Sequence, residues 1–161
     1  MLITEDMLDE LAVPEHIARE LVAKYMEYVT EPKPFVMQAH YIGDSQHVDF
    51  RFKVDGYLEG WSIVGASRDD PHTPQKFLEN IGKGFRAETK ARQPLVWLKV
   101  EGKVAPGEIG AGEEAAGEFK ILTKGQLLTG AQKPYFHEYF IRDKKYFKDW
   151  TRLVIRGIKV A

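Results

Sequence analysis

The sequence contains no cysteine, and this absence excludes two kinds of site. Without thiols the chain can form neither a disulfide framework nor a thiolate metal centre. It also has no apolar run that approaches the roughly 18–20 residues of a transmembrane helix. The first residues, MLITEDMLDEL, are acidic and lack the basic start of a secretory signal. We therefore expect a cytoplasmic protein that has no membrane as a partner.

Two widespread nucleotide-binding motifs are missing as well. The glycine-rich stretch APGEIGAGEEAAG is not a P-loop, because no Gly-Lys-Ser/Thr follows it, and it is not a dinucleotide fingerprint. Its glycines indicate tight turns or bulges instead. No internal repeat or low-complexity linker divides the 161 residues, which are enough to bury one core. We expect a single domain over residues 1–161.

Charges of opposite sign are concentrated at the two ends, although the net charge is only −1. Residues 1–31 carry eight acidic and two basic side chains, whereas residues 142–159 carry seven basic and two acidic ones. A basic C-terminal segment suits contact with a polyanion. Each run taken alone is also what an ordinary solvated face looks like.

The order of the expected elements predicts a mainly β protein. Residues 1–31 should form a helical segment, with one helix over residues 4–12 and a second that begins at Pro14 and ends at TEPKP. The apolar stripe of the second helix consists of Ile17, Ala18, Leu21, Val22 and Tyr25. Many short strands at even spacing then suggest a compact β-barrel over residues 32–161, with one short helix after the first strands, from Pro74 through Leu78 and Ile81. The segment LVWLKVEGKV should be a strand pair or one bent strand.

The most informative stretch is HYIGDSQHVDFRFKVDG, residues 40–56. From Val48 onward its apolar and polar side chains alternate strictly, which is the period of a strand with one buried face. The preceding run FVMQAH is also strand-like, and turn-favouring residues lie between the two runs. If they close as a hairpin, His40 lies opposite His47 and Gln38 lies opposite Asp49, with such pairs about 5 Å apart.

Two imidazoles, a carboxylate and a guanidinium would then meet on one face of the hairpin. His40, His47 and Asp49 are suitable ligands for a divalent metal ion, and Arg51, one step further along, can clamp a phosphate. The alternative is that this polar row is only the solvated face of a strand, because motif matches often carry no function.

The stretch FVMQAHYIGDSQHVDFRFKVDGYLEGWSIV resembles the opening strands of the 3′-phosphoesterase domain of bacterial and archaeal DNA ligase D. That family carries a phrase close to F-V-x-Q-K-H, a short basic loop, and H-Y-D-F-R-L-E-x-D-G-x-L-x-S-W-A-V. The segment EGKVAPGEIGAG is similar to the family's E-G-x-I-P-x-G-E-Y-G-A-G, and the two matches fall in the same order. The ending, HEYFIRDKKYFKDWTRLVIRGI, is similar in style to the family's last strands.

This resemblance implies a compact β-barrel flanked by helices and an activity that removes a 3′-terminal ribonucleotide or phosphate from DNA ends during repair. It implies manganese as the cofactor, and we keep zinc and cobalt as alternatives. The family's metal ligands fall on His40, His47 and Asp49, and its phosphate-binding arginine falls on Arg51, so these four are the expected catalytic residues. The implied partners are DNA or RNA/DNA primer 3′ ends and a DNA ligase or polymerase in trans.

The sequence departs from the family where proton transfer is expected. The family's next catalytic histidine falls on Gln93 and its nearby tyrosine on Trp97. Gln93 can donate a hydrogen bond to a phosphate but cannot act as a general acid near neutral pH. The family's N-terminal basic–acidic pair has no clean counterpart, and Glu27 is the nearest acid. His72 and His137 remain as candidates to protonate a leaving group, or as ordinary surface or packed histidines.

A nucleic-acid path is predicted around the segment GKGFRAETKAR, beside Phe85. Its residues are Lys83, Arg86, Lys90, Arg92 and, further along, Trp97. An ordinary exposed loop would have the same composition. The functional hypotheses are therefore a metal-dependent DNA 3′-end-processing phosphoesterase, a weakened or inactive module that binds DNA ends or a ligase, and a structural barrel without a metal.

Overall fold

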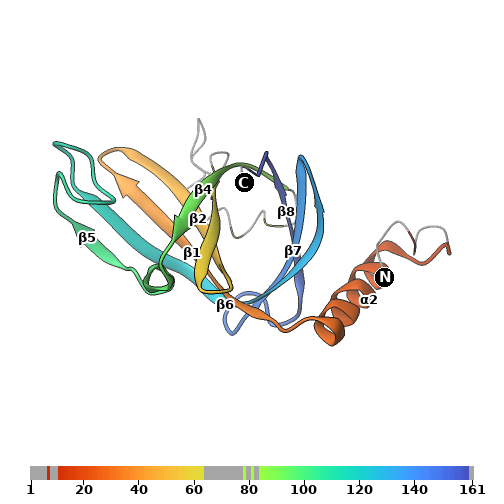
Figure 1. Cartoon of the computed structure of the whole chain (residues 1–161). Helices are drawn as coiled ribbons and strands as arrows, with labels where there is room; N and C mark the ends of the chain where they lie inside the picture. The colour runs from red at the N-terminus through yellow and green to blue at the C-terminus, as the bar shows by residue number, and fades with distance from the viewer. Residues whose placement is uncertain (1–6, 8–10, 64–77, 79–80, 82–83, 160–161) are drawn as a thin grey trace.

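A computed structural model describes residues 7, 11–63, 78, 81 and 84–159 of the chain (Figure 1). This part is mainly β and contains one α-helix, α2 (Glu15–Val29), and a short 3₁₀ helix, η2 (Leu95–Leu98). The strands are β1 (Lys33–Ile42), β2 (Ser45–Val54), β3 (Tyr57–Ile63), β4 (Phe85–Gln93), β5 (Gly102–Val104), β6 (Gly117–Lys133), β7 (Phe136–Asp143) and β8 (Thr151–Arg156). The helices expected over residues 4–12 and 74–81, together with His72 and Lys83, lie wholly or largely outside the described residues.

The eight strands form one sheet in the order β1-β2-β3-β4-β8-β7-β6-β5. All neighbours are antiparallel except β4 and β8, which are parallel. Strand β1 also pairs with β6, so the sequence of hydrogen-bonded neighbours returns to its first strand (Figure 1). The side chains inside this circuit form the main apolar cluster, in which the Trp61 indole donates a 2.9 Å hydrogen bond to the Tyr139 hydroxyl.

The predicted hairpin is present, with the predicted register. His40 lies opposite His47, and Gln38 lies opposite Asp49. Val48, Phe50 and Phe52 are buried in the main cluster, as the alternation predicts. The turn is shorter than the six residues that the composition suggested, because β1 runs to Ile42 and β2 starts at Ser45. Two residues close it, the first of which is Gly43 with a positive φ of 54°.

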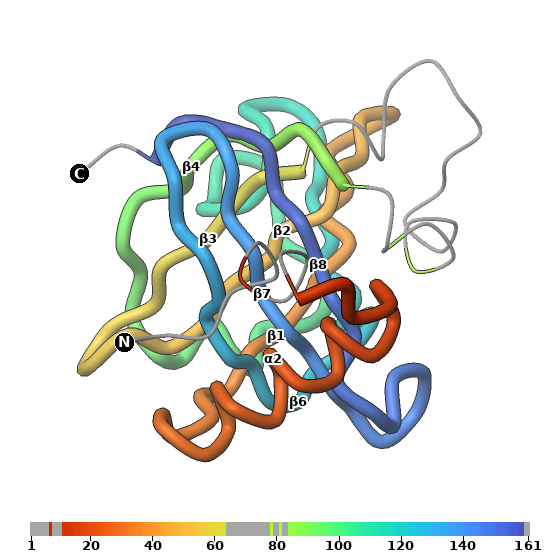
Figure 2. The backbone as a smooth tube through the Cα atoms, turned by 90° about the vertical axis from the view of Figure 1, so that its right-hand side faces the viewer, coloured from red at the N-terminus to blue at the C-terminus, as the bar shows by residue number. Residues whose placement is uncertain are grey.

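Helix α2 covers the outer face of β6 and β7 (Figure 2). The predicted stripe is only partly correct, because Ala18 and Val22 are buried while Ile17 and Leu21 are 39% and 44% exposed. The sheet presents the bulky side chains Leu128 and Phe140 at this contact. Small side chains on the helix let the two surfaces approach, so the larger pair faces outward. No helix in the described part is both long and apolar enough to span a membrane.

Two segments adopt structures that their composition did not predict. The basic segment around residues 85–93 is strand β4 and not a loop, because Ala87 and Phe85 pack on the core while Arg86 and Glu88 point outward. The segment LVWLKVEGKV is not a strand pair: it begins as η2, and only three of its residues form β5. Pro94, which cannot donate a ladder hydrogen bond, separates β4 from η2.

The carboxylate of Asp143 organises the turn after β7. It accepts hydrogen bonds from the Thr123 hydroxyl and from the backbone N–H groups of Lys145, Tyr146 and Phe147, the last three at 2.7–2.9 Å. Burial by itself would raise the pKa of the Asp143 carboxyl. These hydrogen bonds to the ionised form outweigh burial and lower the pKa.

We predict that Asp143→Asn lowers the free energy of unfolding by about 1–3 kcal/mol at pH 7, because an amide offers one oxygen and no charge. A lowered pKa in the folded state stabilises the protein above the unfolded-state pKa of about 3.9, and this contribution disappears as the pH falls through the folded-state pKa. Urea unfolding between pH 7 and pH 3 should therefore show the wild-type advantage shrinking in acid. Exposed Asp149→Asn is the control. An advantage of constant size would contradict this role of the charge.

Candidate metal centre

The polar face of the β1–β2 hairpin is buried, so the hypothesis of a plain solvated strand face is wrong. Asp49 is 0%, Arg51 2% and His40 7% exposed. Strands β1 and β2 are thus covered on both faces, by the apolar core inside and by other parts of the chain outside. Segments from η2, the turn at Gly110 and Phe119 of β6 all contact this face.

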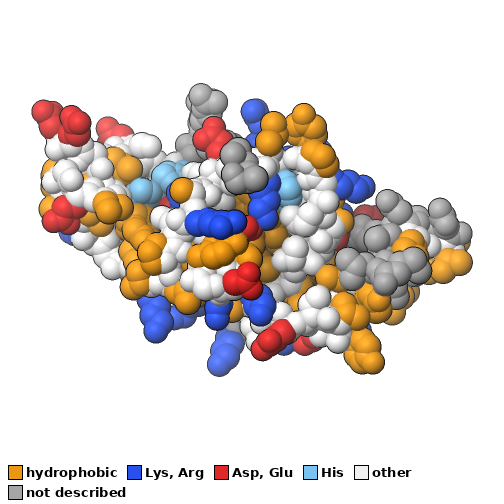
Figure 3. Space-filling view, viewed as in Figure 1, with side chains coloured by type: hydrophobic (Ala, Val, Ile, Leu, Met, Phe, Trp, Pro, Cys, Tyr) orange, Lys and Arg blue, Asp and Glu red, His pale blue; other side chains and the backbone are white. Residues whose placement is uncertain are grey.

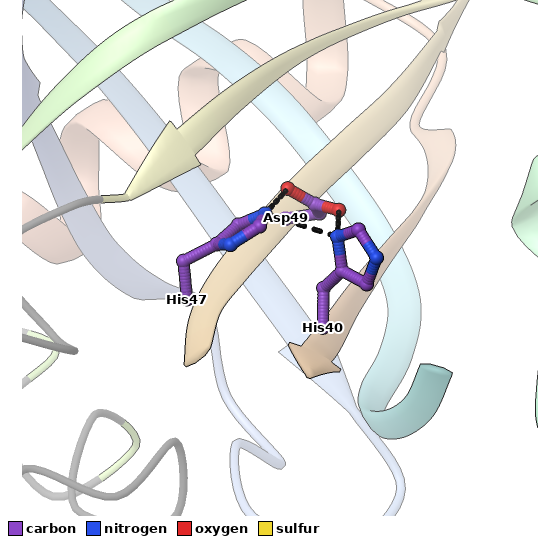
Figure 4. A group of neighbouring side chains, drawn as sticks. All are labelled: His40, His47 and Asp49. Atoms are coloured by element: carbon purple, nitrogen blue, oxygen red, sulfur yellow. Dashed lines mark hydrogen bonds and ion pairs between the residues drawn. The ribbon is translucent and has the colours of Figure 1, made fainter. Parts of the chain in front are cut away.

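The side chains of His40, His47 and Asp49 point toward one another (Figure 4). His40 Nδ1 lies 3.2 Å from His47 Nε2 and 3.6 Å from Asp49 Oδ2. His47 Nε2 lies 3.0 Å from Asp49 Oδ1. His47 and Asp49 are two residues apart on β2, so their side chains lie on the same face of the strand. His40 is the cross-strand partner of His47, which brings the third side chain to the same place.

The ring of His40 is fixed from behind. Its Nε2 lies 2.7 Å from the carbonyl oxygen of Gly110, which can only accept, so Nε2 carries the proton and donates it. The ring also stacks on Phe119 at a centroid distance of 4.1 Å. Gly110 has a φ of 97°, and a Cβ there would lie 2.5 Å from the Phe119 ring, so this turn requires glycine. The bond leaves the lone pair of neutral His40 Nδ1 facing the other two side chains.

The protonation states favour a metal ligand set. Burial lowers the pKa of the His40 imidazole, which keeps the ring neutral and able to donate its lone pair. Burial alone would raise the pKa of the Asp49 carboxyl, but the contact with His47 and the charges of Arg51 and Lys90 hold that pKa well below its usual range. A neutral imidazole and an ionised carboxylate are the forms that bind metal ions.

The three side chains fit a divalent cation. Asp49 Oδ1 is fully buried and accepts no hydrogen bond of good geometry among the described residues, although His47 Nε2 and Lys90 Nζ lie 3.0 and 3.1 Å from it. Bonds of about 2.0–2.1 Å that meet at tetrahedral or octahedral angles place ligand atoms about 2.8–3.4 Å apart. The observed separations of 3.0, 3.2 and 3.6 Å are close to these values. The cluster can therefore hold a metal ion, and its nitrogen and oxygen donors suit several first-row metals.

Arg51 is held in place on three sides. Its Nη2 donates to Asp49 Oδ2 at 3.1 Å, its Nε donates to Gln93 Oε1 at 2.7 Å, and its Nη1 donates to Gln38 Oε1. The Trp97 ring lies over the guanidinium, with its centroid 4.9 Å from Arg51 Cζ. Both positions that depart from the ligase D pattern, 93 and 97, therefore contact Arg51 itself.

Gln38 is a site residue whose role the sequence did not indicate. Its side chain is fully buried, accepts from Arg51, and donates to the carbonyl oxygens of Trp97 and Val100 at 3.0 and 2.8 Å. It therefore ties the segment after β4 to the hairpin. The signal available was its cross-strand position opposite Asp49. Gly110 is one of the glycines that predict tight turns, but neither it nor Phe119 gave a signal of contact with the hairpin.

The predicted nucleic-acid path is distributed along and beyond β4. Lys90 reaches into the centre, with Nζ 3.1 Å from Asp49 Oδ1. The Arg92 guanidinium lies over the Tyr57 ring at 4.3 Å, and exposed Arg86 pairs with Arg156 of β8 in the sheet register. The sequence thus selected Lys90 for a surface role, whereas the structure places it beside the metal-ligand candidates.

Two other candidate residues lie away from the centre. His137 is buried beside Trp61, and its ring nitrogens contact the Gln132 side chain and the Gly157 carbonyl. It is a packed histidine. Glu27 of α2 accepts from the Trp150 indole at 2.9 Å and pairs with a guanidinium on β7.

We predict that divalent metal stabilises the protein through this centre. Bound metal is first removed with a chelator. Adding Mn²⁺, Zn²⁺ or Co²⁺ at about 100 times its Kd should then raise the free energy of unfolding by about 2.7 kcal/mol and the Tm by about 5–10 °C. His47→Ala removes one ligand and should abolish the rise, whereas His16→Ala, an exposed position on α2, should keep it. An equal rise in both variants would place the metal elsewhere.

No family model and no curated protein matches the chain. The candidate centre therefore rests on its own geometry. The resemblance to the ligase D 3′-phosphoesterase domain stays a prediction, carried by the motifs quoted above.

Proposed function

We propose that the protein is a metal-dependent phosphoesterase that processes DNA 3′ ends during repair, removing a 3′-phosphate or a 3′-ribonucleotide. One observation carries this proposal. Two histidines and an aspartate converge in a buried cluster, and the arginine two residues further along β2 is bonded to that aspartate. This combination joins a metal site to a phosphate-binding group, and it falls on the residues that the ligase D resemblance selects.

The proposal extends to the fold and the location of the protein. We expect the circuit of strand pairings to be a compact barrel of the phosphoesterase type, and we expect the protein to work in the cytoplasm. Manganese is the expected metal, with zinc and cobalt as alternatives. The partners are DNA or RNA/DNA primer 3′ ends, with a ligase or polymerase acting in trans.

Each residue has a definite task in this scheme. His40, His47 and Asp49 would hold the metal ion, which when bound polarises a phosphoryl oxygen and lowers the pKa of a water molecule. Arg51 keeps N–H groups beyond the three that its partners use, and a guanidinium can offer these to a phosphate. Gln38 and Gln93 fix the orientation of that guanidinium, which spares the site the cost of ordering it during the reaction.

A second candidate function is a binding module that holds DNA ends without cutting them. The observation that favours it is the environment of Gln93, whose oxygen is committed to Arg51 and which cannot transfer a proton near neutral pH. Among the described residues, no histidine besides the two proposed ligands contacts the centre. The phosphate-binding half of the site would then persist while the acid–base half is missing.

The test uses the purified chain, Mn²⁺ and a duplex primer that ends in a 3′-phosphate or a 3′-ribonucleotide. We expect end processing that His47→Ala reduces by about 100-fold or more, since even partners of metal ligands cost up to that much. His16→Ala should keep wild-type activity. If no end is processed, or if His47→Ala acts at the wild-type rate, the enzymatic proposal fails. DNA binding with a salt-dependent affinity but no turnover would then favour the binding module.

A further inference from the structure

A basic groove lies beside β6, on the part of the surface between η2 and the turn after β7. It has a volume of about 930 Å³. Its cationic side chains are Lys99, Lys124, Arg142, Lys144, Lys145 and Lys148. Asp143 is the single carboxylate among its lining residues. Lysine and arginine side chains project along the lower edge of the molecule in Figure 3, below the place where Figure 1 labels β6.

The positive charge of the groove is not neutralised by its own surroundings. Asp143 is turned inward, where three backbone N–H groups and the Thr123 hydroxyl bind its carboxylate. Within the described ranges, no carboxylate forms an ion pair with Lys99, Lys124, Lys144 or Lys148, and all four are exposed. Arg142 differs, because it pairs with Glu27 at 3.1 Å. The groove therefore offers four unpaired lysine ammonium groups to an anionic partner.

One side of the groove shares a face of the sheet with the metal centre, whereas its lining residues Phe35, Gly125 and Asp143 belong to the opposite register. Directly paired residues of antiparallel strands project to the same side. Along β1 and β6 the pairs on the outer side run from His40–Phe119, at the centre, through Gln38–Ile121 and Val36–Lys124 to Pro34–Gln126. Of these pairs, Ile121, Lys124, Gln126 and Pro34 line the groove. At about 3.3 Å per residue, the six steps from His40 to Pro34 span about 20 Å.

Segment η2 links the two places. Trp97 lies over Arg51 of the centre, while Leu98 and Lys99, the next residues, line the groove. The carbonyl groups on both sides of this pair, at Trp97 and Val100, are anchored by Gln38. The groove wall is therefore fixed to the same side chain that orients Arg51.

The chemistry of the groove fits a nucleic-acid strand better than an acidic peptide. Its floor is apolar, with half-buried Leu98, Ile121 and Leu122 between the lysines. Lysine ammonium groups bind phosphates as point charges without demanding bidentate geometry. Apolar surface beneath a lysine rim suits bases below a phosphate backbone. An acidic peptide would present its carboxylates on flexible side chains and has no comparable flat apolar groups.

We propose that this basic groove binds the phosphate backbone of a nucleic-acid strand whose 3′ end lies at the His40–His47–Asp49 centre. The inference rests on the proposed function for the direction of the strand. It assigns substrate binding to Lys99, which follows η2, and to lysines of β6 and of the turn after β7, a surface separate from the side chains of β4. Asp143 acts as a positioning residue, since its hydrogen bonds hold the turn that presents Lys144 and Lys145.

The experiment measures the binding of a fluorescent single-stranded oligonucleotide by anisotropy over a range of salt concentrations. The strand ends in a 3′-hydroxyl and chelator is present, so neither a terminal phosphate nor a metal contributes. The test variant is Lys124→Ala/Lys144→Ala/Lys148→Ala. The matched control is Lys24→Ala/Lys53→Ala/Lys133→Ala, which removes the same charge from α2, β2 and the end of β6. Circular dichroism confirms that both variants are folded.

We expect the groove variant to lose about 10-fold or more in affinity and to reduce the salt slope by about 2, since each phosphate contact on a single strand contributes about 0.7. The control should bind nearly like the wild type. Equal losses in the two variants, or no loss in either, would overturn the proposal. So would tighter groove-dependent binding of a poly-glutamate peptide than of the oligonucleotide. Because the assay needs no turnover, an inactive metal centre leaves its outcome unchanged, and failure in this assay leaves the 3′-end-processing test intact.

Discussion

The ionised carboxylate of Asp49 is the group on which the surrounding structure depends. A charge with no exposed surface costs several kcal/mol unless partners compensate for its lost hydration. Arg51, Lys90 and His47 approach it from three directions. Removing any one of these partners would leave part of the buried charge uncompensated. That costs more free energy than the intact ion pair contributes to stability. The carboxylate therefore requires compensating side chains on its own strand, β2, and on β4, which lies beyond β3 in the sheet.

The buried partners of Asp49 need hydrogen-bond partners of their own, and these lie further from the carboxylate. Arg51 brings its own buried N–H groups, and Gln38 and Gln93 accept them. Gln38 in turn fixes the backbone that follows β4, and that backbone carries the ring of Trp97 over the guanidinium. The polar layer is thus closed by the chain that it orients. A polar cluster organised in this way holds its side chains near one geometry before any ligand arrives, which is what metal and phosphate sites require.

Much of the hairpin could be predicted from the sequence because its signals are local. Strict alternation defines the inner face of β2, and a two-strand pairing then sets His40 opposite His47. The covering of the outer face could not be predicted in this way. Gly110, Phe119 and Trp97 are distant in sequence and carry no periodic pattern that points to the hairpin. The turn at Gly110 lies in a match to ligase D, but its contact with His40 is visible only in the fold.

Two errors have a common physical origin. Strand β4 and helix α2 were judged by composition and by intrinsic preference, whereas tertiary contacts decide them. The small Ala87 is the buried residue in a strand of charged neighbours, and the small Ala18 faces the sheet while the larger Ile17 and Leu21 of the same predicted stripe are exposed. In both places the limited space between the element and its neighbours determines which side chain is buried. The number of apolar residues in the segment does not determine it. The prediction of Lys90 as part of a surface path also rests on composition, because nothing in the neighbouring sequence indicates that its side chain reaches the buried Asp49 carboxylate.

The central claim is that His40, His47 and Asp49 bind one divalent metal ion together. Anomalous diffraction from crystals grown with Mn²⁺, recorded on both sides of the manganese absorption edge, tests it most directly. We expect a single strong peak between His40 Nδ1, His47 Nε2 and the Asp49 carboxylate, with Lys90 Nζ moved away from Asp49 Oδ1. Full manganese occupancy at another position, or no peak at this position at saturating metal, would contradict it.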